Sequence, residues 1–430
     1  MRLSRTTAAA PVRIVHLGLG NFFRAHQAWY TAHAPDAQDW GIAAFTGRSA
    51  KLADTLSAQD GVYTLITREA KDEFEVVSSI SRAHGAGKHD AWLRYLASPD
   101  TRVVTLTVTE AGYTRDRDGG LDTTDPAVAA DLTALRRGAP VRTAVARLVA
   151  GLAARRDAGA GPIAVVPCDN LPGNGEVLAR LTAECADLVA PGCAEVASFV
   201  TTMVDRITPA TTGADLATAE AATGYRDEAP VVTEPFSEWV LSGEFPGGRP
   251  QWSATFTDDV MPYERRKLWL LNGAHSLLAY TAALRGHRTV GEAVADEVCR
   301  SWLAEWWQEA VPHLDLPAAD LDAYCRALLT RFANPGVRHQ LAQIAMDGSQ
   351  KLPARILPVL REERDAGRLP RGAVRLLAGW VCHLTGAGVP VSDPGAAGVR
   401  DERDALALLD LAGDEELRAA VAAEANRLRG

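Results

Sequence analysis

The pattern of apolar residues changes abruptly near residue 263, and this change constrains the fold more than any other feature of the sequence. Before that point, short runs of continuous apolar character alternate with helical periodicity. Buried strands that alternate with helices are typical of a parallel sheet covered on both faces. After that point, helical patterns punctuated by Gly and Pro follow one another, with no strong strand among them. The sequence therefore predicts an α/β Rossmann-like domain over residues 1–258 and an all-α domain over 259–430.

The individual elements follow from the same patterns. The predicted strands are 12–17, 41–46, 76–81, 103–109 and 162–167, and the helices between them are 21–30, 91–97 and 141–154. The predicted helices of the second half are 266–284, 290–309, 321–332, 337–345, 354–366, 373–385 and 401–429. Residues 233–262, rich in Gly, Pro and aromatic residues, are expected to form an irregular connector.

Size and composition narrow the class of protein. The chain has 430 residues, with 47% hydrophobic and 23% charged residues, which is typical of a soluble globular protein of two domains. A net charge of −9 without a basic stripe argues against nucleic acid as a partner. No apolar run is long enough for a membrane span, and the N-terminus lacks the apolar core of a signal peptide. The six scattered cysteines form no CxxC pair, so reduced thiols and a cytoplasmic location are expected.

A glycine turn follows the first predicted strand. Gly18, Leu19 and Gly20 stand between that strand and a helix that begins with Asn21 and Phe22. In dinucleotide-binding folds the first glycine permits the tight turn, and the second allows the backbone to approach the pyrophosphate. The third glycine of that fingerprint is absent here. We predict a dinucleotide site at this turn, with an ordinary strand-to-helix turn as the alternative.

The end of the second predicted strand bears on the choice of cofactor. An Asp or Glu at this place binds the ribose of NAD, whereas an arginine accommodates the 2′-phosphate of NADP. The segment here contains Arg48 and Ser49 and no acidic residue. NAD(H) and NADP(H) both remain open, because Arg48 could also stay in solvent or stack on the adenine.

Lys267, Asn272 and His275 lie on one predicted helix. Asn272 and His275 are three residues apart and therefore share a face of that helix. Gly273 costs about 1 kcal/mol inside a helix, which indicates that another group packs close to its backbone. A polar stripe of this kind is usually a solvated face. The surrounding leucines and Trp269 instead favour a buried helix whose polar groups need partners.

Several blocks of the sequence together resemble one known family. They are residues 16–28 with the glycine turn, 109–113, 167–175 with Asn170, 199–209 with Asp205, 267–275, and 347–353 with Lys351. In this order they resemble the mannitol dehydrogenase family, the polyol-specific long-chain dehydrogenases, over a stretch from about residue 12 to the end. The resemblance implies a nicotinamide-dependent oxidoreductase that needs no metal. It also implies a C-terminal domain of the 6-phosphogluconate dehydrogenase type.

The resemblance also implies roles for single residues. Lys267 would be the general base for a secondary alcohol, with Asn170 and Asn272 as donors to the alkoxide-like oxygen and His275 orienting a substrate hydroxyl. Asp205 and Lys351 would contact the substrate, and Glu264 would relay or gate the proton. Arg24 would contact the substrate, and Glu110 would contribute to the cofactor site together with the glycine turn.

Substrate and partners are less constrained. A polyol/ketose pair and a hexonate/hexuronate pair compete, and the second requires cationic donors such as Arg24, Arg265 or Arg266. The family pattern has a histidine at the position of Phe23, with no known catalytic consequence. Mannitol-type members have an arginine near Gln343, and its absence here puts a mannitol-specific role in doubt. The alternatives are a sugar-phosphate dehydrogenase, a zinc-dependent polyol dehydrogenase and a non-catalytic nucleotide-binding regulator. A monomer is expected.

The tryptophans at 302, 306 and 307 stand at helical spacing. Aromatic residues in such a pattern are more often core residues than ligand contacts. We expect this cluster to belong to the helical core. The histidines at 84 and 89 are expected at the surface.

Overall fold

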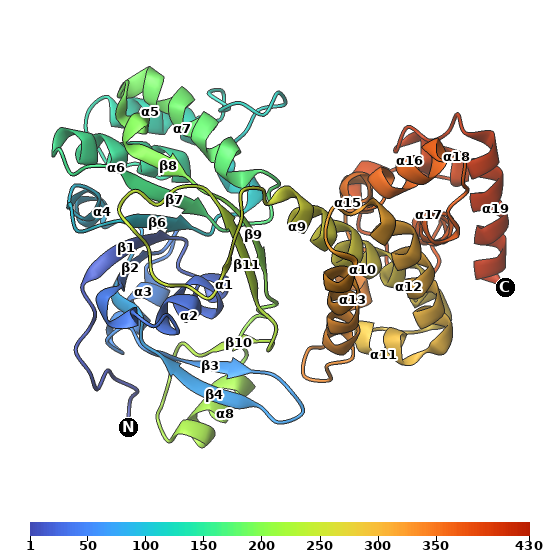
Figure 1. Cartoon of the computed structure of the whole chain (residues 1–430), viewed down its shortest axis with the longest axis horizontal. Coiled ribbons are helices and arrows are strands. Elements are labelled where there is room, and N and C mark those ends of the chain that lie inside the picture. The colour runs from blue at the N-terminus through green and yellow to red at the C-terminus, as the bar shows by residue number, and fades with distance from the viewer. The chain divides into compact units, whose positions relative to one another are not determined.

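The computed structural model describes all residues from 1 to 430 (Figure 1). The chain divides into two compact units, residues 1–261 and residues 262–430. No helix in either unit combines the length and apolar character needed to cross a bilayer.

Unit 1 is built on a six-stranded sheet in the order β5-β2-β1-β6-β7-β8. All five neighbouring pairs are parallel. The strands are β1 (Val12–Leu17), β2 (Gly41–Phe45), β5 (Ile80–His84), β6 (Val103–Leu106), β7 (Ile163–Pro167) and β8 (Ala197–Phe199). Numbered by position, this is the 3-2-1-4-5-6 order of dinucleotide-binding folds, which bind their ligand where the strand order reverses. That point lies between β1 and β6.

Helices cover both faces of this sheet (Figure 1). Because side chains alternate across a strand, Val15 and Leu17 of β1 enter one core cluster and Ile14 enters the other. The first cluster includes residues of α4 (His89–Leu96), α6 (Ala144–Asp157) and α7 (Asn174–Val189). The second includes residues of α1 (Asn21–Ala25), α2 (Gln27–Ala32) and α3 (Lys51–Ser57). The remaining helices of the unit are α5 (Pro126–Leu135) and α8 (Gly213–Thr223).

Two small sheets complete unit 1 and correct two sequence-based expectations. One sheet contains β3 (Tyr63–Thr67), β4 (Glu73–Val77) and β10 (Val231–Thr233), and the other β9 (Thr201–Asp205), β11 (Glu238–Ser242) and β12 (Thr255–Phe256). The single strand predicted over 76–81 is wrong, because the chain leaves β4 and enters β5 of the main sheet within that stretch. The connector predicted over 233–262 is only partly irregular, since β11 pairs with β9.

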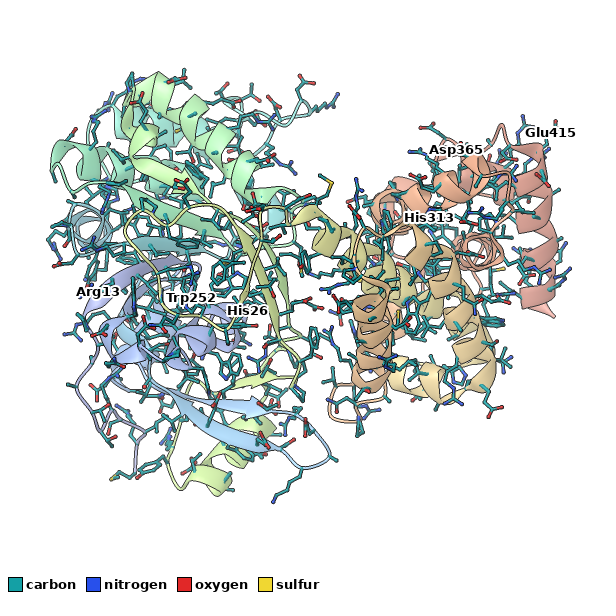
Figure 2. All side chains as sticks on the ribbon, viewed as in Figure 1. Arg13, His26, Trp252, His313, Asp365 and Glu415 are labelled. Atoms are coloured by element: carbon teal, nitrogen blue, oxygen red, sulfur yellow. The ribbon has the colours of Figure 1, made fainter.

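Aromatic packing explains why residues 233–262 are ordered. Trp239 of β11 is 1% exposed and lies 4.6 Å from Trp252, ring centroid to ring centroid. The indole N–H of Trp252, a residue labelled in Figure 2, donates to the hydroxyl of Thr31 at 3.0 Å and so ties the segment to α2. Burial of two large aromatic side chains outweighs the turn-forming composition around them.

Unit 2 is helical. Its helices are α9 (Met261–Arg266), α10 (Ala274–Thr281), α11 (Val290–Ala295), α12 (Glu297–Ala310), α13 (Ala318–Phe332), α14 (Leu341–Ile344), α15 (Gly348–Arg355), α16 (Leu357–Asp365), α17 (Arg371–Leu384), α18 (Glu402–Ala407) and α19 (Glu415–Arg429). All eight residues of α10 are buried, and this helix packs against α12, α14 and α17. The continuous helix predicted over 266–284 is wrong in one respect, because residues Lys267–Gly273 form a π-helix.

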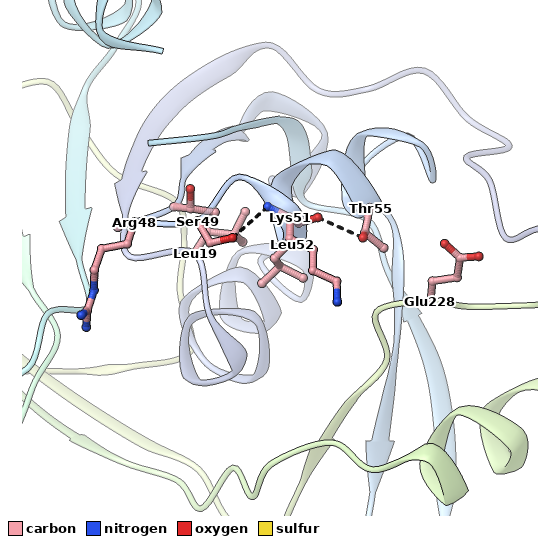
Figure 3. Close-up of a pocket in the computed structure, with 9 residues that line it drawn as sticks. Leu19, Arg48, Ser49, Lys51, Leu52, Thr55 and Glu228 are labelled. Carbon is pink, nitrogen blue, oxygen red and sulfur yellow. Dashed lines mark hydrogen bonds between the residues drawn. The ribbon is translucent and has the colours of Figure 1, made fainter. Parts of the chain in front are cut away.

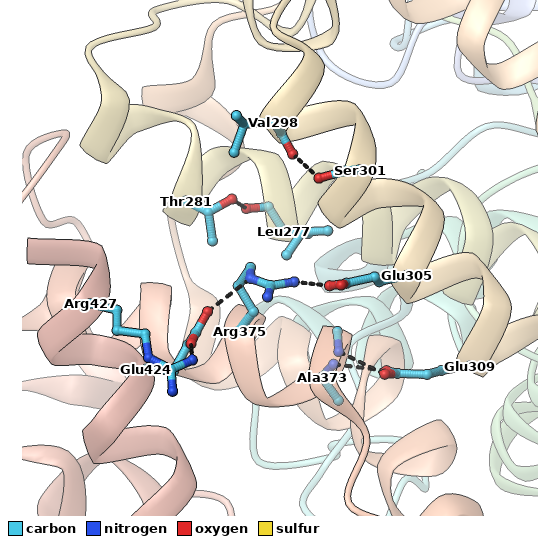
Figure 4. A network of polar contacts seen from close by, with 11 residues as sticks. Leu277, Thr281, Val298, Ser301, Glu305, Glu309, Ala373, Arg375, Glu424 and Arg427 are labelled. Atoms are coloured by element: carbon cyan, nitrogen blue, oxygen red, sulfur yellow. Dashed lines mark hydrogen bonds and ion pairs between the residues drawn. The ribbon is translucent and has the colours of Figure 1, made fainter.

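Ion pairs join three of these helices (Figure 4). Arg375 of α17 pairs with Glu305 of α12 and, at 2.9 Å, with Glu424 of α19. Glu309 of α12 accepts hydrogen bonds from the backbone N–H groups of Gly372 and Ala373 at 2.7 and 3.0 Å. A carboxylate at this position satisfies two of the free N–H groups in the first turn of α17. These contacts fix α12 against α17.

Candidate cofactor and catalytic sites

The glycine turn has the backbone geometry that its sequence predicts. Gly18 has a φ of +116°, and a Cβ added there would lie 2.3 Å from the carbonyl oxygen of Thr107. The backbone N–H groups of Gly18 and Leu19 donate to the carbonyl of Phe45, both at 2.9 Å. A Cβ added at Gly20 would meet only the Gly18 carbonyl oxygen, at 3.5 Å. Gly18 is therefore required by the fold, whereas Gly20 leaves its backbone approachable, as a pyrophosphate site needs.

Arg24 has structural partners in this turn. It is 2% exposed, and its guanidinium donates to the carbonyls of Gly20 at 3.2 Å and Ala229 at 2.5 Å and to the Asn21 side-chain oxygen at 2.7 Å. These bonds use three of the five N–H donors of the guanidinium. Arg24 thus braces the glycine turn, and its contact with the substrate stays a prediction. The predicted helix 21–30 is interrupted at His26, where α1 ends and α2 begins.

A pocket of about 490 Å³ lies at the C-terminal ends of β1, β6 and β7. Three residues named from the sequence line it: Phe22, Glu110 and Asn170. Beside Asn170, Asp169 accepts hydrogen bonds from the Tyr113 hydroxyl and, at 2.9 Å, from the backbone N–H of Leu171. Burial nevertheless raises the pKa of Asp169. The pocket occupies the edge at which this strand order binds nucleotides.

A second pocket, of about 360 Å³, lies beyond the end of β2. It is lined by Leu19 of the glycine turn and by Arg48, Ser49 and Lys51, and by Glu228 (Figure 3). Figure 3 shows Arg48 and Glu228 at opposite ends of the residues drawn. The Glu228 carboxylate is paired with Arg226 at 3.2 Å. Two cationic side chains and a hydroxyl thus stand where an acidic ribose ligand would be expected for NAD.

The π-helix changes the geometry of the catalytic segment. In an α-helix, residues five apart are rotated by about 140° from one another. In a π-helix the backbone hydrogen bond joins residues five apart, so that Lys267 and Asn272 lie one above the other on the same face. Both side chains are partly exposed. The segment therefore presents an amine and an amide side by side, an arrangement that α-helical spacing does not predict.

His275 is buried at the start of α10. Its ring lies 4.9 Å from Phe332 and 4.9 Å from His339, centroid to centroid. Burial, with the positive charges of Arg331 and Arg355 nearby, lowers the pKa of His275 well below its usual value. The imidazole is neutral near pH 7, and can donate or accept a hydrogen bond without changing charge.

The other residues named from the sequence lie on separate elements. Lys351 of α15 is half-buried, donates to the Met346 carbonyl at 2.6 Å, and has its pKa lowered by burial and by Arg355. Asp205 ends β9, is 5% exposed and stands opposite Glu238 of β11. Glu264 lies in α9.

One cluster was missed by the sequence analysis. His287, Asp296 and Cys299 have potential ligand atoms within 4.8 Å of one another. Their spacing in the sequence is not that of zinc ligands. The fold brings them together, because His287 lies in the turn before α11 and the other two residues lie at the start of α12. Arg285 donates to the same Asp296 oxygen that contacts His287, at 2.7 Å. The arginine supplies the positive charge that a cation would bring.

Fold and site together define a class of protein. The strand order, the required glycine and the pockets at the sheet edge suit a nicotinamide dinucleotide, and a helical unit carries a lysine–asparagine face. This combination is that of a dinucleotide-dependent oxidoreductase.

Comparisons with known proteins identify the family. The family profile described as the mannitol dehydrogenase Rossmann domain matches residues 12–254, and that of the mannitol dehydrogenase C-terminal domain matches residues 259–425. The chain belongs to the mannitol dehydrogenase family and is an oxidoreductase, as the sequence blocks predict.

Relatives and solved structures agree with this assignment. D-mannonate oxidoreductase of Escherichia coli is 38% identical over 87% of this chain and 80% of its own length. Mannitol 2-dehydrogenase of Cereibacter sphaeroides is 36% identical over 90% and 85%, respectively. A D-sorbitol dehydrogenase in substrate-free form has a TM-score of 0.90 at 28% identity, covering 98% of this chain and 94% of its own. Pseudomonas fluorescens mannitol 2-dehydrogenase, with NAD and D-mannitol, has a TM-score of 0.78 at 32% identity, covering 99% and 92%.

Proposed function

We propose that the protein interconverts a secondary alcohol of a linear polyol or sugar acid with the corresponding ketose or keto-acid. The observation that carries this proposal is the shared face of Lys267 and Asn272 on the π-helix. The nicotinamide, when bound at the glycine turn and its adjoining pockets, accepts or returns a hydride. The residues of the chain handle the proton and the oxygen.

In the oxidising direction, the Lys267 amine takes the proton of the substrate hydroxyl. Asn272 and Asn170 donate hydrogen bonds to the oxygen as it gains negative charge. Neutral His275 orients a neighbouring hydroxyl, and Asp205, Lys351 and Glu264 complete the substrate contacts. In the reducing direction, the Lys267 ammonium returns the proton. No step assigned to these residues requires a metal ion.

NADP(H) is the cofactor that the pocket beyond β2 favours. Arg48, Ser49 and Lys51 line it, and its one carboxylate, Glu228, is paired with Arg226. Cations and a hydroxyl are partners for a 2′-phosphate. Coenzyme titrations should give tighter binding of NADPH than NADH. Arg48→Ala and Lys51→Ala should each weaken NADPH about tenfold and NADH little, while the exposed-lysine control Lys71→Ala changes neither. Equal binding of both coenzymes to the unmodified protein would contradict this preference.

A sugar acid is favoured over a neutral polyol by the charges around His275. The charges of Arg331 and Arg355 lower the pKa of His275, and Lys351 lies one turn before Arg355. Asp347 and Asp393 also lie near Lys351 and offset part of this positive charge. Positive groups gathered at a substrate-binding helix favour a carboxylate. The similarity to D-mannonate oxidoreductase points the same way.

One panel tests the reaction, the cofactor and the substrate together. The purified protein is assayed with NADH and NADPH against fructose, fructuronate, tagaturonate and xylulose. We expect turnover with NADPH and with the keto-acids above the neutral ketoses. Turnover with neutral ketoses alone would overturn the sugar-acid preference. No turnover with any of the four would sink the proposed function.

A further inference from the structure

The π-helix lies against two tryptophans of α12. The indole N–H of Trp306 donates to the carbonyl of Trp269 at 2.8 Å, and that of Trp307 donates to the carbonyl of Leu270 at 2.9 Å. Trp306 is 0% exposed and Trp307 8% exposed. Two consecutive residues of one helix thus bind two consecutive carbonyls of the other. Buried donors and acceptors of this kind hold a fixed geometry, because leaving either unpaired is costly.

Glycines set Trp306 closely against its neighbours. A Cβ added at Gly273, the last residue of the π-helix, would lie 2.9 Å from the Nε1 and Cζ2 atoms of Trp306. A Cβ added at Gly372 of α17 would lie 2.8 Å from the Trp306 Cα. Trp306 is therefore enclosed between α17 and the end of the π-helix. The contacts of Glu309 with the start of α17 fix the other side of this arrangement.

A third donor reaches the same segment. Arg355 of α15 donates to the Asn272 carbonyl at 3.4 Å and to the Ser276 hydroxyl at 3.1 Å. Side chains from α12 and α15 thus bind the carbonyls of three residues within the seven-residue π-helix. Because side chains bind these carbonyls, the carbonyls depend less on the i→i+4 hydrogen bonds of an α-helix. Without such partners, the α-helix is the more common conformation and the π-helix is rare.

We propose that Trp306 and Trp307 are positioning residues for proton transfer. Their indole N–H groups hold residues 267–273 in the π-helical register and so keep Lys267 and Asn272 on one face. The inference rests on the proposed function, in which Lys267 is the base. If the register relaxed towards an α-helix, Asn272 would rotate away from Lys267. The proposed mechanism needs an amine that is unprotonated near neutral pH, and we expect a displaced amine to lose part of that property.

The test removes the N–H groups and keeps aromatic rings. W306F and the double variant W306F/W307F are compared with W302F, because Trp302 lies on the same helix but stacks under Arg285 and Arg375 instead. We expect kcat to fall on the order of 100-fold in the double variant, as a misplacement of about 1 Å can cause. In the oxidising direction, the acid limb of the kcat/KM profile should move to higher pH, with coenzyme Kd unchanged. W302F should match the unmodified protein.

Two measurements keep the proposal falsifiable if a variant is poorly folded. Competitive labelling of lysine amines, resolved by peptide mass spectrometry, gives the titration of Lys267 without substrate or turnover. It should shift upward in W306F/W307F and not in W302F. G273A should also shift it, because the added Cβ displaces the Trp306 ring, and the effects of G273A and W306F should be less than additive. An unshifted Lys267 titration with unchanged kcat in the double variant would overturn the inference.

These outcomes are separable from those of the proposed function. If K267A retains full turnover, then Lys267 is not the base and the proposed mechanism fails. If K267A is inactive while W306F/W307F keeps the normal pH profile, then the mechanism stands and the positioning role fails.

Discussion

The glycine turn of unit 1 and the π-helix of unit 2 are both short backbone features, but they are held in different ways. At the turn, the requirement is local and steric: Gly18 has a positive φ, and Thr107 leaves no room for a side chain. At the π-helix, the conformation is accompanied by bonds from residues far along the chain, as in the pair Trp306–Trp269. The conformation of the turn is determined by a short local motif, whereas that of the π-helix depends on tertiary contacts. Substitutions should therefore affect the two features differently.

Lys267→Ala should lower kcat more than any other single substitution proposed for this protein. General acid–base catalysis contributes about 10²- to 10⁴-fold, so we expect kcat to fall about 1000-fold. The cofactor features lie in unit 1, so the coenzyme Kd should stay the same. Stopped-flow hydride transfer and fluorescence titration measure the two quantities. Lys351→Ala should mainly raise KM, and a comparable loss of kcat there would contradict Lys267 as the single base.

Gly18→Ala and Gly20→Ala should separate folding from binding at the turn. The alanine Cβ at position 18 would overlap the Thr107 carbonyl in a disfavoured backbone region, so we expect about 3 kcal/mol less free energy of unfolding for unit 1. At position 20 the added Cβ meets only one atom, at 3.5 Å. That variant should keep its stability and lose coenzyme affinity. Urea unfolding and coenzyme titration distinguish them; equal stability losses would show that both glycines serve the fold.

The same distinction explains what the sequence could predict. The glycine turn and the strands β1, β2, β6 and β7 follow from local patterns, whereas β5 is misplaced and β8 is not predicted. The parallel order places the C-terminal ends of these strands at one edge. The π-helix could not be predicted, because the apolar pattern of residues 267–273 fits an α-helix equally well. Its partners on α12 lie 37 residues away. Gly273 carried the one local signal, since a glycine inside a buried helix indicated a close neighbour, which proves to be Trp306.

Arg24 and β11 show two further limits of local pattern. The bracing role of Arg24 is not visible in the sequence, because its three acceptors come from the folded turn and from Ala229. β11 is flanked by turn-forming residues, and its strand state depends on pairing with β9 and on the burial of Trp239. Gly20 and Asn21 are local partners of Arg24, but Ala229 lies 205 residues away, and the pairing of β11 with β9 likewise joins distant segments.

His275→Ala should have a smaller effect than the loss of Lys267. Removing one hydrogen bond to a substrate hydroxyl costs about 1 kcal/mol, so kcat/KM should fall about fivefold. The pKa of His275 lies well below its usual value, and the ring is therefore neutral throughout the neutral range. The pH profile of the variant should keep the shape of the unmodified protein between pH 6 and 8, about the range where an ordinary histidine titrates. A limb that disappears with the histidine would show that it titrates during catalysis.

Glu363→Gln should give the smallest effect of these substitutions, and the effect should be on stability. It tests whether the stability of unit 2, like the geometry of its π-helix, depends on contacts between separate segments. Glu363 binds Arg368 at 2.6 Å and His313 at 2.5 Å, and the arginine lowers the pKa of the carboxyl to about 2. A depressed carboxyl pKa stabilises the fold above the unfolded value near 4.5, and this contribution is lost as pH falls towards 2. At pH 7 the substitution should lower the free energy of unfolding by about 1 kcal/mol, after allowance for solvent screening on the open side of the pair.

Hydrogen exchange should show this loss of stability in α16 and α17 and not in unit 1. The loss should shrink as the pH is lowered to 3. Glu362→Gln, at an exposed neighbouring position, should leave exchange unchanged at both pH values. A loss of stability of the same size for both substitutions would indicate a general effect of charge. The ion pair of Glu363 would then make no specific contribution to the stability of unit 2.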